Sequence, residues 1–273
     1  MNNKYYFVFI LLLSSICSQY AIAGQLDNNL NVGISLQDFS YTEFGDTDIV
    51  LNREDGLLPG FILGAGVHWD NFSGVLRGEI FNGLVDYNGQ TQSGIPLKAK
   101  TDEKITRVEA TLHFNLKPFN QYNMSVLAGI GYREWRRDIN ATRITLSLLE
   151  IYRWKYWTLG TSVTFFKKGK RSAGVNVRLL RPIKPTLDVK FPGFDEVTLD
   201  LGVNDSARLE LFYHFVLRNN QQWTISPYWE YWYMGRSPNK GLTINGVSTV
   251  NVAWEPRSDT KIFGVLLSVR FEP

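Results

Sequence analysis

The stretch TRVEATLHFNL, residues 106–116, alternates between two kinds of side chain with a period of two. One set is mostly apolar and the other polar or charged: Thr106, Val108, Ala110, Leu112, Phe114 and Leu116 against Arg107, Glu109, Thr111, His113 and Asn115. Such alternation is typical of a β-strand with two unlike faces. In a soluble protein the apolar face would form the core. In a membrane barrel it contacts lipid, and the polar face lines the interior.

Stretches of this kind recur along the chain. A near copy, ARLELFYHFVL at 207–217, shares the pattern R-x-E-x-x-x-H-F-x-L. Five stretches end on an aromatic residue: Trp69, Phe114, Phe165, Phe215 and Phe271. The residue before the aromatic is polar in each, and four of these residues are predicted at the periplasmic end of the lumen: His68, His113, His214 and Arg270. About nine residues suffice for a tilted strand to cross a bilayer. The aromatic ends are therefore predicted to form a periplasmic girdle.

Five more alternating stretches run in the opposite direction, near 30–37, 72–85, 122–133, 173–181 and 223–234. The connections after the aromatic ends are short, and those at the other side are long: about 38–60, 86–105, 134–156, 182–206 and 235–262. This predicts an all-β fold, a transmembrane up-and-down antiparallel β-barrel with short periplasmic turns and long extracellular loops. Ten strands close the barrel without an edge, and twelve are the alternative. A soluble β-sandwich or lipocalin-like barrel would not collect aromatics at one end of the apolar face.

The N-terminal residues have the pattern of an export signal. Lys4 precedes the apolar run 5–13, and Ala21-Ile22-Ala23 forms a cleavage site before Gly24. The predicted organisation is therefore a signal peptide over 1–23 and an outer-membrane β-barrel domain over 24–273. Cys17 is the single cysteine and lies in the signal, which excludes disulfides and thiolate chemistry from the mature chain. A formal net charge of +3 gives no argument for a nucleic-acid partner.

The export signal and the last strand, FGVLLSVRF at 263–271, resemble those of Gram-negative outer-membrane β-barrel proteins of the small ten-stranded type. The last strand is similar to the C-terminal assembly signal of that class, although Glu272 and Pro273 follow Phe271 here. The resemblance implies residence in the cell outer membrane. It also implies contact with outer-membrane lipids and lipopolysaccharide, and with the outer-membrane assembly machinery during biogenesis.

Charged pairs of the form R-x-E lie on the inward face of several strands, because residues i and i+2 share a side. The predicted lumen-facing ionic network comprises Arg77, Glu79, Arg107, Glu109, Arg133, Arg178, Arg208, Glu210 and Glu230. A ten-stranded barrel is only slightly wider than the eight-stranded kind, which side chains fill. We therefore expect a paired ionic plug, with a narrow charge-lined conduit as the alternative.

The three histidines are predicted on different walls and lack metal-ligand spacing, so no metal and no cofactor is expected. A ten-stranded barrel also resembles that of the omptin proteases, which work with acidic residues and an Asp–His pair near the extracellular rim. The histidines here are predicted at the opposite end. The leading hypothesis is a non-enzymatic structural or surface protein, or a narrow porin-like channel. The alternatives are a rim-located enzyme, either an omptin-like protease or a lipid-modifying enzyme, and a surface adhesin.

Overall fold

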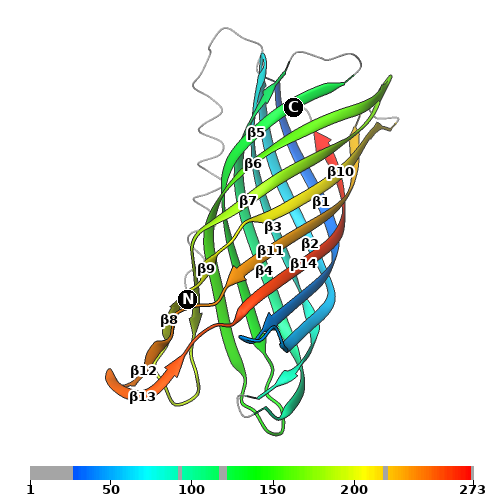
Figure 1. Ribbon diagram of the computed structural model, residues 1–273. Coiled ribbons are helices and arrows are strands. Elements are labelled where there is room, and N and C mark those ends of the chain that lie inside the picture. The colour runs from blue at the N-terminus through cyan, green and yellow to red at the C-terminus, as the bar shows by residue number, and fades with distance from the viewer. Residues whose placement is uncertain (1–26, 92–93, 117–121, 218–220, 272–273) are drawn as a thin grey trace, which may run out of the picture.

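The computed structural model describes residues 27–91, 94–116, 122–217 and 221–271. The predicted signal peptide, residues 1–23, lies outside the described residues. Within them, no helix is long and apolar enough to cross a membrane. Ten long strands run antiparallel to their neighbours (Figure 1): β1 (Asp27–Phe44), β2 (Val50–Trp69), β3 (Phe72–Gln90), β4 (Pro96–Asn115), β5 (Asn123–Ile139), β6 (Leu148–Lys168), β7 (Arg171–Val189), β10 (Ser206–Val216), β11 (Gln222–Gly235) and β14 (Arg257–Phe271).

The sheet closes on itself, because β14 pairs with β1 through Val32 and Val269 while β7 pairs with β10. The predicted ten-stranded up-and-down barrel is therefore confirmed. Pro227 interrupts the β10–β11 ladder, where pairing lapses between Glu210–Tyr228 and Tyr213–Ile225, and the register resumes unchanged. Proline has no N–H to donate, which accounts for the local break.

The two ends of the barrel differ, and we name them by their connections. At the turn end, residues 70–71 join β2 to β3 and residues 169–170 join β6 to β7. At the loop end, the chain between β7 and β10 carries β8 (Val197–Asp200) and β9 (Gly202–Val203). The chain between β11 and β14 carries a hairpin of β12 (Lys240–Ile244) and β13 (Val247–Ala253), which projects from the barrel in Figure 1.

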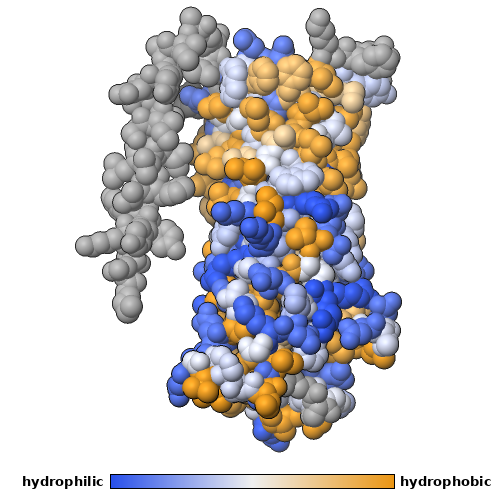
Figure 2. All heavy atoms as spheres, turned by 60° about the vertical axis from the view of Figure 1, so that its left-hand side comes forward, coloured by the Kyte–Doolittle hydropathy of each residue, from blue (hydrophilic) through white to orange (hydrophobic). Residues whose placement is uncertain are grey.

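The outer surface of the turn-end half is apolar. Outward side chains there are mostly exposed aliphatics and aromatics, among them Leu63, Val108, Leu159, Leu211 and Val265. We call this surface the apolar belt, and Figure 2 shows it in orange on the upper half of the molecule. The predicted girdle residues lie at its turn-end margin: Trp69, Phe114, Phe165, Phe215 and Phe271. The belt ends on the other side where the outward residues become charged, at Asp38, Asp55, Lys104, Glu134, Lys155, Arg181 and Lys261.

The strands continue well past this charged boundary, so the loops are shorter than predicted. Only residues 45–49, 91–95 and 140–147 join the first three strand pairs at the loop end, whereas about 38–60, 86–105 and 134–156 were expected. The reason is that the outer face meets water beyond the belt, so charged side chains occur on both faces and the alternation of polar and apolar residues is lost. On β5, Glu134 and Arg136 point outward and are flanked by the buried Trp135 and Arg137. A strand whose outer face is charged has a polar composition similar to that of a loop, so the sequence pattern predicted a loop there.

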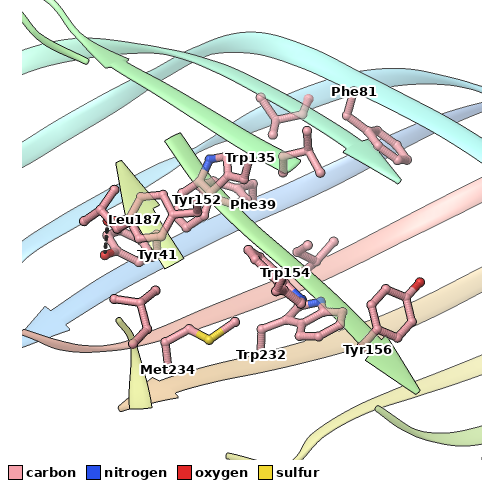
Figure 3. Packing of buried hydrophobic residues seen from close by; sticks show 14 of the residues in the cluster. Phe39, Tyr41, Phe81, Trp135, Tyr152, Trp154, Tyr156, Leu187, Trp232 and Met234 are labelled. Carbon is pink, nitrogen blue, oxygen red and sulfur yellow. Dashed lines mark hydrogen bonds between the residues drawn. The ribbon is translucent and has the colours of Figure 1, made fainter. Parts of the chain in front are cut away.

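The hydrophobic core lies inside the barrel, in the loop-end half. Seven buried rings form what we call the aromatic layer (Figure 3): Phe39, Tyr41, Trp135, Tyr152, Trp154, Tyr156 and Trp232. Trp135 stacks on Tyr152 with centroids 4.6 Å apart. Inward glycines make room for rings, since a Cβ added at Gly131 would lie 2.2 Å from the Tyr156 ring. The barrel interior is thus filled by side chains, as its small diameter favours.

Candidate functional site

Nine charged side chains form a layer across the lumen, between the turn end and the aromatic layer. They are the nine residues predicted to face inward: Arg77, Glu79, Arg107, Glu109, Arg133, Arg178, Arg208, Glu210 and Glu230. We call them the ionic layer. Glu230 is at its centre: Oε2 accepts from Arg107 Nη1 at 2.6 Å and from Arg208 Nη1 at 2.7 Å, and Oε1 accepts from Arg133 Nη1 at 2.7 Å.

Four further contacts extend the layer to the surrounding strands. Arg107 Nε donates to Glu79 Oε2 at 2.8 Å, and Arg77 Nε lies 2.6 Å from Glu79 Oε1. Arg208 Nη2 donates to Glu210 at 3.0 Å, and Arg178 Nη1 donates to Glu109 at 2.6 Å. The layer thus combines five guanidinium groups with four carboxylates.

The strand register explains why these charges meet. β3 and β4 both carry R-x-E and run antiparallel, so Arg77 lies opposite Glu109, and Glu79 lies opposite Arg107. Elsewhere the register places like charges together, as with Arg178 and Arg208. Opposed like charges destabilise a strand pair unless a counter-charge is near. Glu210 supplies it, contacting Arg208 at 3.0 Å and Arg178 at 3.8 Å.

Sequence reasoning did not include two neutral residues that complete the ionic layer. Tyr156 donates its hydroxyl to Glu109 Oε2 at 2.9 Å, and Trp232 donates Nε1 to Glu230 Oε1 at 2.5 Å. Both are buried and inward, at even positions that follow the alternation of β6 and β11. Extending the period-two pattern through these strands would have identified them.

The aromatic layer covers the ionic layer on its loop-end side. The Arg133 guanidinium carbon lies 5.3 Å from the ring centroid of Trp154 and 5.1 Å from that of Trp232. These two indoles meet edge to face with centroids 5.3 Å apart. The lumen is therefore filled first by ion pairs and then by packed rings.

On its turn-end side the ionic layer forms the floor of a water-accessible space, which we call the vestibule. Two adjoining cavities of about 360 and 700 Å³ make it up, and the larger is lined by Asn71, Asn115 and Thr224 at the turn end. The predicted periplasmic-end residues line these cavities: His68, His113, His214 and Arg270.

Each of two histidines is held by a threonine. His113 Nε2 lies 3.1 Å from Thr111 Oγ1, and His214 Nδ1 lies 2.7 Å from Thr224 Oγ1. Within the described part of the chain, no three His, Cys, Asp or Glu side chains are placed so that they could hold a metal ion together.

A second charged group lies beyond the apolar belt, in the loop-end half of the lumen. Arg137 Nη1 donates to Glu43 at 2.9 Å and to Glu150 at 2.6 Å, and its Nε donates to both oxygens of Glu54 at 3.1 Å. Glu255 accepts from the Tyr152 hydroxyl at 2.7 Å, and Glu103 accepts from Trp135 Nε1. All five carboxylates are buried. We call these glutamates and Arg137 the acidic cluster: Glu43, Glu54, Glu103, Glu150, Glu255 and Arg137.

Five carboxylates facing one guanidinium leave an excess of buried negative charge. Burial raises the pKa of Glu103, and the neighbouring Glu54 raises it further. Burial likewise raises the pKa of Glu150 and of Glu255, and Glu43 adds to both. These groups therefore retain protons at a higher pH than free carboxyl groups do. Sequence analysis missed this cluster because its residues fell in segments predicted to be loops.

Comparisons with known proteins agree with the fold. No protein-family model and no curated protein sequence matches the chain. Among solved structures, it is similar to the outer membrane protease OmpT from Escherichia coli, with a TM-score of 0.59 and 10% identity over 94% of this chain and 99% of that one. It is also similar to the translocator domain of the autotransporter NalP from Neisseria meningitidis, with a TM-score of 0.38 and 11% identity over 97% of this chain and 95% of that one. At 10% identity the likeness to OmpT concerns the fold alone, and it agrees with the closed up-and-down β-barrel described above.

Proposed function

We propose that the chain is a non-enzymatic structural or surface protein of the outer membrane, with a closed lumen and with its loop end outside the cell. One observation carries the proposal: the ion pair between Arg107 on β4 and Glu230 on β11 connects opposite walls of the barrel. Packed rings fill the next level. An ion entering from the turn end would have to displace both layers, so a porin-like channel has less support.

Planar-bilayer recording of the purified full-length mature chain tests this proposal. The expected result is the absence of steady single-channel steps under an applied voltage, in bilayers where insertion is verified independently. Reproducible current steps with a fixed amplitude would contradict the closed lumen and favour the narrow channel.

The histidine positions bear on the enzyme alternative. The sequence contains three histidines, and all of them line the vestibule, at the far end from the loops. The resemblance to omptins implies an Asp–His pair near the extracellular rim, and no histidine is placed to form it. A peptidase assay on whole cells that express the chain should therefore show no activity above cells carrying an empty vector.

A pair of opposed cations on the outer face supports lipopolysaccharide as a partner. Lys104 and Arg136 lie directly opposite each other on β4 and β5, both outward and just past the apolar belt, and Arg136 lies 3.6 Å from Asp138. Opposed like charges favour an anionic ligand between them. The double variant Lys104→Gln/Arg136→Gln should retain less lipopolysaccharide on purification. Lys261→Gln, at the same boundary but on β14, is the matched control.

The loop tips support surface recognition as a second candidate function. Aliphatic side chains are exposed at the tips of several connections: Ile49, Ile95, Ile144, Leu146, Val247 and Val250. Val250 on the projecting hairpin is 98% exposed. Larger exposed apolar patches mark interaction sites. If the chain is an adhesin, Val250→Asp should reduce binding of expressing cells to host-cell layers without lowering the surface amount, whereas Asn251→Asp should have little effect.

A further inference from the structure

The hairpin between β6 and β7 extends past the turn-end margin of the apolar belt. Phe165 belongs to that margin, yet β6 continues to Lys168 before residues 169–170 lead the chain into β7. In the β2–β3 hairpin, by contrast, Trp69 at the margin pairs directly with Phe72, the first residue after the turn. The β6–β7 hairpin therefore carries side chains beyond the girdle, on the side of the lipid headgroups.

A β-bulge at this margin turns two aromatic rings toward the membrane. The pairing of β6 with β7 shifts just before Phe166, so that Phe165 has no partner of its own and Phe166 pairs with Ala173. Ala173 shares the outward face of β7 with Val177, and Phe166 therefore faces outward as Phe165 does. The two rings are 47% and 41% exposed. Together they form an apolar surface at the level where acyl chains meet headgroups.

The same register places two cations opposite each other beyond these rings. Lys168 pairs with Arg171 two residue pairs after Phe166, so both exposed side chains are on the outward face. Two residues along a strand tilted by about 45° correspond to about 5 Å along the membrane normal. The headgroup region is about 5–7 Å thick on each side of the hydrocarbon core. The two cations therefore lie at headgroup level.

Within the described part of the chain, no Asp or Glu lies beside this pair of cations. The sequence contains no acidic residue in 110–133, 151–187 or 211–229, which cover the turn-end parts of the neighbouring strands. The nearest acidic residues on β6 and β7 are Glu150 and Asp188, and both are at the loop end. Like charges that are directly opposed destabilise a strand pair. The pair of Lys168 and Arg171 therefore favours an anion from outside the chain.

A shallow cavity adjoins these cations on the side of the β10–β11 hairpin. It has a volume of about 530 Å³, and Lys167, Lys170 and Arg171 line it together with Val216 and Gln222. Its charged lining residues are thus all cations, and Gln222 adds an amide group. The cavity has room for the polar part of a headgroup next to the opposed pair.

From this order of rings and cations we infer that the outer surface of the β6–β7 hairpin binds an anionic phospholipid of the periplasmic leaflet. Lys168 and Arg171 hold its phosphodiester, and Phe165 and Phe166 lie against its acyl chains. Ammonium and guanidinium groups bind phosphate oxygens by charge-assisted hydrogen bonds, and basic residues beside a membrane attract anionic lipids. A zwitterionic lipid brings its own cation, so the site favours a headgroup with net negative charge. The site requires a barrel that spans the membrane, whether or not its lumen is closed.

Native mass spectrometry of the full-length mature chain in nonionic detergent tests this inference. The probes are phosphatidylglycerol and phosphatidylethanolamine of equal chain length, and saturable, tighter binding of phosphatidylglycerol is expected. Lys168→Gln/Arg171→Gln should weaken that binding at least about tenfold, because each cation near an anionic headgroup contributes about fivefold. The matched control is Arg53→Gln/Lys100→Gln, which removes two exposed cations that face Asp55 and Asp86. The control should bind phosphatidylglycerol like the parent chain.

Thermal unfolding provides a second readout. Without anionic lipid, Lys168→Gln/Arg171→Gln should unfold at the same temperature as the parent or higher, because the repulsion between the two cations is removed. Phosphatidylglycerol should raise the unfolding temperature of the parent more than that of this variant. Retention of lipopolysaccharide should be the same in both, which separates this site from the one proposed at Lys104 and Arg136.

Three outcomes would overturn the inference: equal affinity of the parent for the two lipids, unchanged phosphatidylglycerol binding by Lys168→Gln/Arg171→Gln, or an equal loss in the control. Equal stabilisation of the parent by soluble glycerol phosphate would also overturn it, because the ligand would then be a free phosphate and not a lipid.

Discussion

Arg107 and Glu230 form an ion pair across the full width of the lumen, with Nη1 2.6 Å from Oε2. β4 and β11 lie five strands apart in a ring of ten, so no other pair of walls is more distant. Glu230 also accepts from Arg133 and Arg208. One buried carboxylate thereby holds three guanidinium groups from three other strands, and the barrel wall is connected through its interior.

Removing this carboxylate should destabilise the barrel strongly. Glu230→Gln leaves three buried guanidinium groups without their shared counter-ion, at a cost of about 3–5 kcal/mol in the free energy of unfolding. Urea unfolding in lipid vesicles measures the change. Asp205→Asn is the control, because Asp205 pairs with Arg181 on the exposed surface at 2.7 Å. Such pairs contribute about 0–1 kcal/mol. Equal losses in the two variants would contradict the central role of Glu230.

Removing one ion pair near the vestibule should not open the lumen. In the double variant Arg178→Ala/Glu109→Ala a charged pair is deleted, but Trp154 and Trp232 still fill the level behind it. Planar-bilayer recordings of this variant should be as silent as those of the parent chain. Steady conductance would show that ion pairs alone close the barrel.

A charge placed on the apolar belt should impair folding into lipid. Ala110 lies on the outward face of β4 within the belt, next to Val108 and Leu112. Ala110→Arg should cost about 2–4 kcal/mol if this position is near the bilayer midplane. Asp102 lies on the same face of the same strand but past the charged boundary, so Asp102→Arg should lower the free energy of folding into lipid much less. Folding yield in vesicles, read from heat-modifiable gel mobility, compares the two.

Stability should fall as the pH rises, because of the acidic cluster. The pKa of Glu103, of Glu150 and of Glu255 is raised in the folded state. The unfolded chain loses these protons near the ordinary value of 4.5, while the folded chain keeps them. The folded state then binds more protons, so the free energy of unfolding decreases with pH from about 4.5 until the raised pKa values are passed.

The unfolding temperature between pH 5 and pH 9 measures this dependence. Glu255→Gln, which mimics the protonated side chain, should flatten the decrease. Glu134→Gln, on the outer face and half-exposed, should leave the slope as in the parent. A flat profile for the parent chain would mean that the buried carboxylates are ionised throughout.

Epitope tags at the loop end should be reachable on intact cells. Asn140 and Gly246 lie in connections at that end, whereas Asn71 and Gln221 lie at the turn end. Gly89 was expected to lie in a loop but belongs to β3, where an added Cβ would meet Asn52 at 2.6 Å. Gly94 has open space around it and is the better position. Antibody labelling at Asn71 but not at Gly246 would show that the turn end, and not the loop end, faces the outside of the cell.

Within the membrane span, the sequence by itself determined most of the architecture. Lipid on one side and a polar interior on the other impose a simple alternation. The pattern around Ala110 therefore predicted which residues face inward, and the paired R-x-E motifs of β3 and β4 predicted the ion pairs. The aromatic strand ends predicted the turn-end margin of the belt, as Phe114 and Phe271 show.

Only the tertiary structure decided what lies beyond the belt and which distant charges meet. Past Lys104 the outer face is in water, and the interior holds packed rings together with the acidic cluster, so the simple alternation of polar and apolar side chains is lost and the strands were taken for loops. The acidic cluster around Arg137 was missed for that reason. The contact of Arg107 with Glu230 depends on the number of strands and on closure of the barrel, because 123 residues separate them in the chain. Periodicity reports which face a side chain is on, but its partner across the lumen depends on the closed sheet.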